Sequence, residues 1–277
     1  MDLSKIYPPR PPWVHKGNYG SVLIICGSKL YSGSATLAAV SALRAGADLV
    51  TVVSPERSAN IAANTLPDLI TYPLKGDFLS SRHINDVMDI AHVRRVNSVV
   101  IGCGLGRHQS TVLTVQKLIQ KLIVPTVIDA DALYSASLIP GLILGKHVVL
   151  TPHLGELAIL LGQKKIDEDF NLRLESAKAA AQKYRSIILL KGHVDIITDG
   201  ATTITNNTGT SFMTKGGFGD TLAGIVGALL ARGVGLFEAA HSAAYINGKA
   251  GELVAAQFGE GLAASDIFNK IPAVING

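Results

Sequence analysis

SVLIICGSKLYSGSATLAAVSALRAGADLVTVV, residues 21–53, contains the pattern that decides the fold. A short apolar, β-branched run (21–26) is followed by small residues, then by an alanine-rich segment (34–46) and a second apolar run (48–53). Runs of this length and composition are typical of strands, and the segment between them is long enough for a helix. This order predicts a layered α/β structure with parallel strands.

The same alternation continues along the chain. Further strands are expected at 97–102, 125–130, 147–152, 186–191 and 194–198, and further helices at 111–122, 155–162, 168–184, 220–233 and 237–257. The strands show little polar alternation, as expected where helices cover both faces of a sheet. The last two strands are close enough to form a hairpin, which predicts an antiparallel edge. No linker or repeat divides the chain, so we expect one domain over 1–277, with a mostly parallel central sheet flanked by helices on both faces.

Composition limits the classes of function. Apolar residues make up 48% of the chain and charged residues 17%, which is enough for a substantial buried core. The net charge is only +4 and the basic residues are scattered, so we expect no nucleic-acid partner. No segment resembles a signal peptide or a membrane span. Cys26 and Cys103 both lie in or beside apolar runs, which predicts packed thiols in a reduced, cytoplasmic compartment.

Ligands of parallel α/β sheets gather at the carboxyl ends of the strands. The segments expected at that edge are GSKLYSGSA (27–35), GCGLGR (102–107), DADAL (129–133), TPHLGE (151–156), KGHVD (191–195) and NNTGTSFMTKGGFGD (206–220).

TKGGFGDTLAG (214–224) is the most specific of these motifs. Gly216, Gly217 and Gly219 allow a turn with bare backbone amides, and Asp220 would begin the next helix. Amides turned toward one point at a helix N-terminus bind anions. Phosphoryl transfer needs such a cradle and a base for the attacking hydroxyl. A helix cap would need one Asp or Ser and no triple glycine, which favours a phosphate site.

The other motifs leave alternatives open. GCGLGR is a near-match to a dinucleotide fingerprint, with Asp129 and Asp131 about 25 residues further on, but it also fits a plain turn or a surface for another ligand. Gly33-Ser34-Ala35 could bind an anion, or Ser34 could cap the helix.

TPHLGE carries two further candidates. His153 could donate to a substrate or act as an acid–base group, or be structural. Glu156 could hold a magnesium-bound water, or complement the helix dipole.

Together these motifs resemble the ADP- or ATP-dependent NAD(P)H-hydrate dehydratases, which belong to the ribokinase-like superfamily. The matching segments, in order, are HKGNYGSVLIICGS, YSGSATLAAVSALRAGADLVTV, VVIGCGLGR, VIDADAL, LTPHLGELAILLG, ILLKGHVDIIT and TKGGFGDTLAGIVGALLARG. The resemblance implies a ribokinase-like three-layer sandwich and a hydro-lyase that repairs the S form of hydrated NADH or NADPH. It implies ADP or ATP as co-substrate and Mg²⁺ as cofactor. Water is a poor leaving group, so the ring hydroxyl would be phosphorylated first, and phosphate would then be expelled.

The resemblance also implies roles for individual residues. Asp220 would contact the ring hydroxyl and act as the base, and Glu156 could orient Mg²⁺ through water. The implied anion hole is Gly217, Phe218 and Gly219. The implied contacts to the hydrated dinucleotide are Ser34, Ala35, Gly104, His153 and Asp220. The implied ADP or AMP contacts are Lys191, Gly192, His193, Val194, Asp195 and Gly219.

Two positions depart from the family pattern. Relatives usually read G-G-T-G-D, whereas this chain has Phe218, which removes a hydroxyl but keeps the backbone amide. Relatives often read G-A-P or G-A-A where this chain has Gly33-Ser34-Ala35.

Several wider expectations follow from the resemblance. We expect no fused epimerase domain, a separate epimerase in the same pathway, and a homo-oligomer. The alternatives are a ribokinase-like kinase of a small vitamin-precursor alcohol and a non-catalytic nucleotide-binding regulator.

Overall fold

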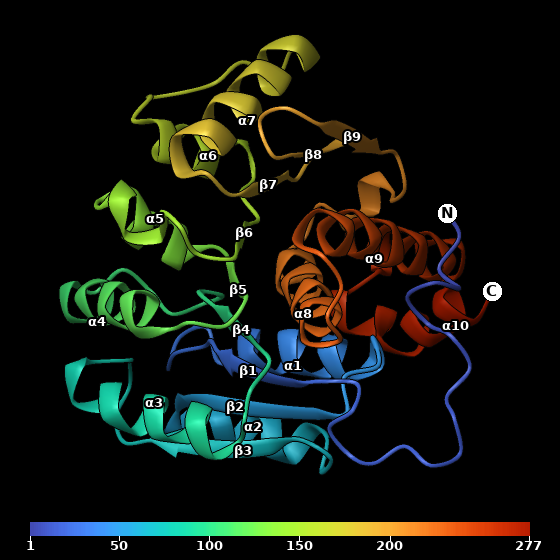
Figure 1. The fold of residues 1–277 in the computed structure, drawn as a ribbon. Coiled ribbons are helices and arrows are strands. Elements are labelled where there is room, and N and C mark those ends of the chain that lie inside the picture. Colours follow the sequence, from blue (N-terminus) through green and yellow to red (C-terminus); the bar gives the residue numbers. More distant parts are fainter.

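The computed structural model describes residues 1–277 and has one nine-stranded sheet, ordered β3-β2-β1-β4-β5-β6-β7-β8-β9 (Figure 1). Strands β1 to β7 run parallel, and β8 and β9 are antiparallel additions at one edge. The strands are β1 (Ser21–Ile25), β2 (Leu49–Pro55), β3 (Ile70–Leu74), β4 (Ser98–Ile101), β5 (Thr126–Ile128), β6 (Val148–Leu150), β7 (Ile187–Leu190), β8 (Asp195–Thr198) and β9 (Thr203–Asn206).

Helices cover both faces of this sheet (Figure 1). The helices are α1 (Ser34–Arg44), α2 (Glu56–Thr65), α3 (Ile84–Val93), α4 (Gln109–Lys121), α5 (Asp131–Ser137), α6 (Leu154–Leu161), α7 (Phe170–Tyr184), α8 (Phe218–Ala231), α9 (Leu236–Phe258) and α10 (Ile271–Asn276). Each face has its own apolar core. Val22 and Ile24 of β1 face the core shared with α1, α8 and α9, whereas Leu23 and Ile25 face the core shared with α3 to α7. The predicted three-layer α/β sandwich is therefore confirmed.

Every strand and helix expected from the sequence is present, including the antiparallel edge. The structure adds β3, β9, α2, α3, α5 and α10. Strand β3 contains Pro73 and is mostly half-buried, and β9 is a polar edge strand, so neither has the apolar run on which strand prediction depends. The alanine-rich side of α9 packs in the core.

Helices α1 and α8 pack closely against each other. A Cβ atom at Gly224 would lie 2.1 Å from the carbonyl oxygen of Ala38, so only glycine allows this approach. The two helices therefore bring their N-terminal ends to the same edge of the sheet. None of the helices has both the length and the apolar content that a membrane crossing requires.

The carboxyl ends of the parallel strands meet at this edge. Strand β5 leads into Asp129, β6 into Thr151, and β7 into Lys191. Because β8 is antiparallel to β7, its first residue, Asp195, lies at the same edge. The topology thus gathers motifs that are far apart in the sequence.

Candidate active site

The glycine turn before α8 forms the centre of the site. Gly217 is the N-cap in a left-handed conformation, with φ of 103°, and α8 begins at Phe218 rather than at Asp220 as expected from the sequence. The amides of the first helical turn have no partners within the helix, and the helix dipole adds partial positive charge there. Asp220 lies within this first turn, so the anion-binding amides and the acid belong to one structural feature.

Phe218, the departure from the family pattern, has a structural role. Its side chain is only 6% exposed and packs in the core with α1 and α8, while the residue also borders the adjacent cavity. Its carbonyl accepts hydrogen bonds from Thr221 Oγ1 (2.9 Å) and Asn247 Nδ2 (3.4 Å). The aromatic ring therefore holds the turn by packing, and its amide stays at the helix N-terminus.

The Asp220 carboxyl lies in a setting that favours proton exchange near neutral pH. Burial and the negative charge of Asp129 raise the pKa of Asp220 to about 7, against the opposing effects of the Ser34 hydroxyl and the Lys191 ammonium. A base whose pKa is close to the working pH is the most effective for proton transfer. The position suits a general base.

A buried ion-pair network lies beside Asp220. Asp129 is 1% exposed, and its Oδ1 accepts hydrogen bonds from Thr151 Oγ1 (2.6 Å) and Lys191 Nζ (2.8 Å). The Lys191 ammonium also lies 3.8 Å from Glu156 Oε2. Burial alone would lower the pKa of Lys191, but the charges of Asp129 and Glu156 outweigh it and raise that pKa, so the ammonium stays protonated.

His153 and Glu156 cap helix α6 reciprocally. His153 Nδ1 accepts hydrogen bonds from the amides of Gly155 (3.0 Å) and Glu156 (3.3 Å), and Glu156 Oε2 accepts one from the amide of His153 (2.8 Å). The His153 ring is 61% exposed, which leaves Nε2 free to donate to a ligand, with Glu156 Oε1 3.4 Å away. The structural and functional interpretations of this motif are therefore compatible.

Glu156 also bears on the expected magnesium ion. Its carboxylate is buried, and burial raises the pKa of Glu156, against the attraction of Lys191. Because its oxygens already face His153 and Lys191, the side chain suits contact through water better than direct coordination. Magnesium commonly keeps several waters and is held largely by substrate phosphates, so these residues fit a hydrated ion.

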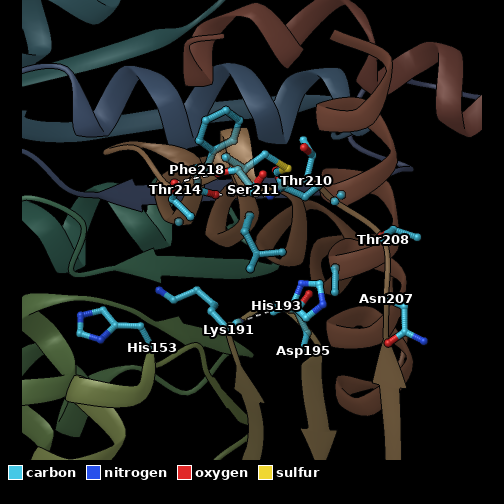
Figure 2. Close-up of a pocket in the computed structure, with 18 of the residues that line it drawn as sticks. His153, Lys191, His193, Asp195, Asn207, Thr208, Thr210, Ser211, Thr214 and Phe218 are labelled. Atoms are coloured by element: carbon cyan, nitrogen blue, oxygen red, sulfur yellow. Dashed lines mark hydrogen bonds between the residues drawn. The ribbon is translucent and has the colours of Figure 1, made fainter. Parts of the chain in front are cut away.

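A cavity of 770 Å³ opens beside the glycine turn (Figure 2). On one side lie Lys191, His193 and Asp195, and opposite them are Thr210, Ser211, Thr214 and Phe218 (Figure 2). Of the expected site residues, the cavity is lined by His153, Lys191, Gly192, His193, Asp195, Phe218 and Gly219. Its size and mixed lining suit a nucleotide-sized ligand.

The KGHVD loop is held by its last residue. Asp195 accepts hydrogen bonds from the Gly192 amide (3.0 Å) and from Asn206 Nδ2 (3.0 Å), and burial raises the pKa of Asp195. Val194 does not line the cavity, and its carbonyl accepts a hydrogen bond from Arg173 Nη2 (2.7 Å). His193 and Gly192 are exposed at the cavity wall.

The remaining expected residues lie beside the cavity rather than in it. Gly104 has a left-handed conformation with φ of 64°, and a Cβ there would lie 2.6 Å from Ser34 Oγ, so these two residues are in close contact. Ser34 does not cap α1, whose N-cap is Gly33. Ala35 is fully buried, so only Ser34 of this pair presents a side chain to a ligand.

Sequence reasoning missed three features of the site. The sequence suggested Asp129 only as a ribose-binding acid. Asp129 and Lys191 each follow a buried strand of the same parallel sheet, and this shared position could have indicated their ion pair. Cys103 was treated as a packed thiol, and its Sγ donates to Asp129 Oδ2 at 3.4 Å. The polar loop 207–215 lies within a segment expected at the ligand-binding edge, but the sequence did not identify Thr210 and Thr214 as the residues that line the cavity.

The order of the strands and the helices on both faces give the chain the ribokinase-like α/β fold. A solved ribokinase-like superfamily protein from Enterococcus faecalis has a TM-score of 0.80 and 22% identity, covering 100% of this chain and 94% of its own.

The chain belongs to the NAD(P)H-hydrate dehydratase family, whose model matches residues 22–273. An ADP-dependent (S)-NAD(P)H-hydrate dehydratase of Nitrosopumilus maritimus is 34% identical over 99% of this chain and 94% of its own length. A solved ADP/ATP-dependent NAD(P)H-hydrate dehydratase from Bacillus subtilis, co-crystallized with ATP/Mg²⁺, has a TM-score of 0.79 and 25% identity, covering 99% and 96%.

Longer relatives match as well. A bifunctional NAD(P)H-hydrate repair enzyme of Methanothermobacter thermautotrophicus is 39% identical over 99% of this chain but only 53% of its own length. The chain thus spans about half the length of several curated relatives that it matches.

Proposed function

We propose that this protein is an ADP-dependent hydro-lyase that dehydrates the S form of hydrated NADH or NADPH, releasing AMP and phosphate. The observation that carries the proposal is the Asp220 carboxyl, with a pKa of about 7, in the first turn of a glycine-capped helix beside a nucleotide-sized cavity. Family membership supports the same substrate class.

The proposed reaction begins with phosphorylation. The Asp220 carboxylate takes the proton of the ring hydroxyl, and the hydroxyl oxygen attacks the terminal phosphorus of ADP. The bond from that phosphorus to AMP breaks, and the moving phosphoryl group rests on the amides of Gly217, Phe218 and Gly219. The ring nitrogen lone pair then expels phosphate, and loss of a proton from the adjacent ring carbon restores the double bond.

Other residues bind the two substrates in this proposal. Lys191 to Asp195 hold ADP in the cavity, with Lys191 near the phosphates. His153 donates through Nε2 to the hydrated dinucleotide, which also contacts Ser34 and Gly104. Glu156 would hold a hydrated magnesium ion through water, and that ion would supply positive charge against the ADP phosphates.

Two further proposals concern the cell. We propose that the protein acts in the cytoplasm, because its two cysteines are free thiols, as in a reducing compartment. We also propose that the protein forms a homo-oligomer, since Leu253 and Phe258 leave apolar surface exposed on α9. We propose further that a separate epimerase supplies the S form of the substrate. Sedimentation velocity measures the oligomeric state.

The direct test follows the absorbance band of reduced nicotinamide. Enzymatically hydrated NADH or NADPH is incubated with the protein, magnesium and ADP, with ATP in a parallel arm. We expect the band to recover until the S form is consumed, and an added epimerase to complete the recovery. No recovery with either donor would rule out the dehydratase. Phosphorylation of a vitamin-precursor alcohol in its place would identify a kinase.

Asp220→Asn separates catalysis from binding. We expect turnover to be lost, because an amide cannot accept the hydroxyl proton, while ADP still binds in isothermal titration calorimetry. Surviving turnover would exclude Asp220 as the base. If the variant lost both turnover and ADP binding, Asp220 would have a structural role.

A further inference from the structure

Three side chains of kinds that can bind metal ions lie close together near the glycine turn that precedes α8. Cys103 Sγ and one carboxylate oxygen each from Asp129 and Asp220 all lie within 4.8 Å of one another. They come from the turn after β4, the end of β5 and the first turn of α8. No other three His, Cys, Asp or Glu side chains in the structure come together in this way.

We propose that Cys103, Asp129 and Asp220 form a binding site for a thiophilic divalent cation, Zn²⁺ or Cd²⁺. Zinc binds sulfur at about 2.3 Å and carboxylate oxygen at about 2.0–2.2 Å, so tetrahedral donors stand roughly 3.3–3.7 Å apart. Donors that already lie within 4.8 Å need only small side-chain rotations to reach that spacing. The Cys103 Sγ to Asp129 Oδ2 distance of 3.4 Å is already in range.

The two oxygens of Asp129 are used differently. Thr151 and Lys191 both donate to Oδ1, whereas Oδ2 faces Cys103 and is the oxygen available to a cation. The hydrogen bond with Cys26 and burial raise the pKa of the Cys103 thiol, so a cation that binds here displaces the thiol proton. Once the thiol and both carboxyls are deprotonated, they leave a net negative site beside the Lys191 ammonium, which suits a dication. The fourth coordination position is open, because Asp220 is only partly buried and the adjacent Gly219 lines the cavity.

The thiol decides which cation the site selects. Magnesium prefers oxygen ligands, whereas sulfur favours zinc and cadmium. The site is therefore different from the hydrated magnesium position suggested at Glu156. A cation bound here occupies the Asp220 carboxylate, so it competes with the function of that group as a base.

The test is a titration of the protein with CdSO₄ in the absence of nucleotide. Cadmium bound to a thiolate absorbs in the ultraviolet, so binding is read without any turnover. We expect one Cd²⁺ per chain, loss of the band in Cys103→Ser, and its retention in Cys26→Ser. Cys26 is the other buried thiol and the more stringent control, because it interacts with Cys103 but is not one of the three clustered ligands, and its Sγ donates to the Val100 carbonyl.

Three outcomes overturn the proposal: no band in the wild-type chain, a band unchanged in Cys103→Ser, or equal loss in both cysteine variants. If Cys103→Ser does not fold, Asp220→Asn gives the decision, since at least tenfold weaker Cd²⁺ binding supports the site and unchanged binding rejects it. Because the band needs no substrate, a failure of the proposed dehydratase activity leaves this result unaffected.

Discussion

Asp220 shows how one residue links folding to catalysis. Its carboxyl is partly buried and lies near Asp129, and both effects raise the pKa of Asp220 to about 7. The rate of the proposed reaction depends on the charged form of this base. We therefore expect kcat/KM, which reports the pKa of the ligand-free protein, to rise with pH through about 7 and to level off above it. Stopped assays of kcat/KM across this range test the profile, and a flat profile would exclude titration of the base.

The same carboxyl makes stability depend on pH. The pKa of Asp220 is about 7 in the folded chain and 3.8 when unperturbed, so the folded state holds its proton more tightly. Its contribution to stability is complete below about pH 4 and is lost as pH rises through 7. Asparagine does not titrate, so we expect the stability of Asp220→Asn relative to wild type to increase as pH rises from about 4 to 7. Thermal unfolding of both proteins at pH 5 and pH 8 measures this difference in stability. A difference of the same size at both pH values would contradict the assignment.

Asp129 acts on Asp220 through charge. Asp129→Asn removes the neighbouring negative charge, so we expect the pKa of Asp220 to fall and the rising limb of the kcat/KM profile to move to lower pH. Asp131→Asn is the matched control, because Asp131 pairs with Arg107 and the Gly106 amide and does not influence Asp220. A shift of equal size in both variants would show that the effect is not specific.

At the scale of elements, the turn before α8 allows a matched pair of substitutions. Gly217 has a positive φ, and a Cβ there would lie 2.7 Å from Leu37 Cδ1, whereas a Cβ at Gly216 meets nothing within 4 Å. We expect Gly217→Ala to lower the free energy of unfolding by about 1–3 kcal/mol and to reduce turnover, because strain and overlap shift the anion-binding amides. Gly216→Ala should change stability by less than about 0.5 kcal/mol. Urea unfolding and kcat measure both, and equal effects would contradict the geometry.

The elements differ in how well the sequence predicts them. Strands β1, β2 and β4 to β8 each contain a run of apolar, mostly β-branched residues, and these runs identify them. Strand β3, with Pro73, and the polar β9 depend on pairing with a neighbour, which no local pattern records. The start of α8 was placed two residues late, because Asp220 resembles a cap while the actual N-cap is Gly217.

At the scale of the whole molecule, ligand binding couples to global stability. The cavity is built from the segments that follow β6 and β7, from β8, α8 and α9, and from the loop 207–215, so unfolding destroys it. A ligand at 100 times its Kd stabilises the folded chain by about 2.7 kcal/mol. We expect ADP to raise the Tm with increasing concentration and AMP to do so more weakly, as measured by scanning calorimetry. No shift with ADP would argue against a nucleotide site here.

The sequence by itself determined the α/β class, the two-faced burial of the sheet, and the glycine turn with Asp220, because these depend on local periodicity and residue chemistry. The resemblance to the family then implied that Lys191, His153 and Glu156 belong to the site. Only the tertiary structure decided that Asp129 pairs with Lys191, that Phe218 packs in the core, and that Cys103 lies beside two carboxylates. These contacts join residues far apart in the chain, and only the register of neighbouring strands and the packing of α8 bring them together.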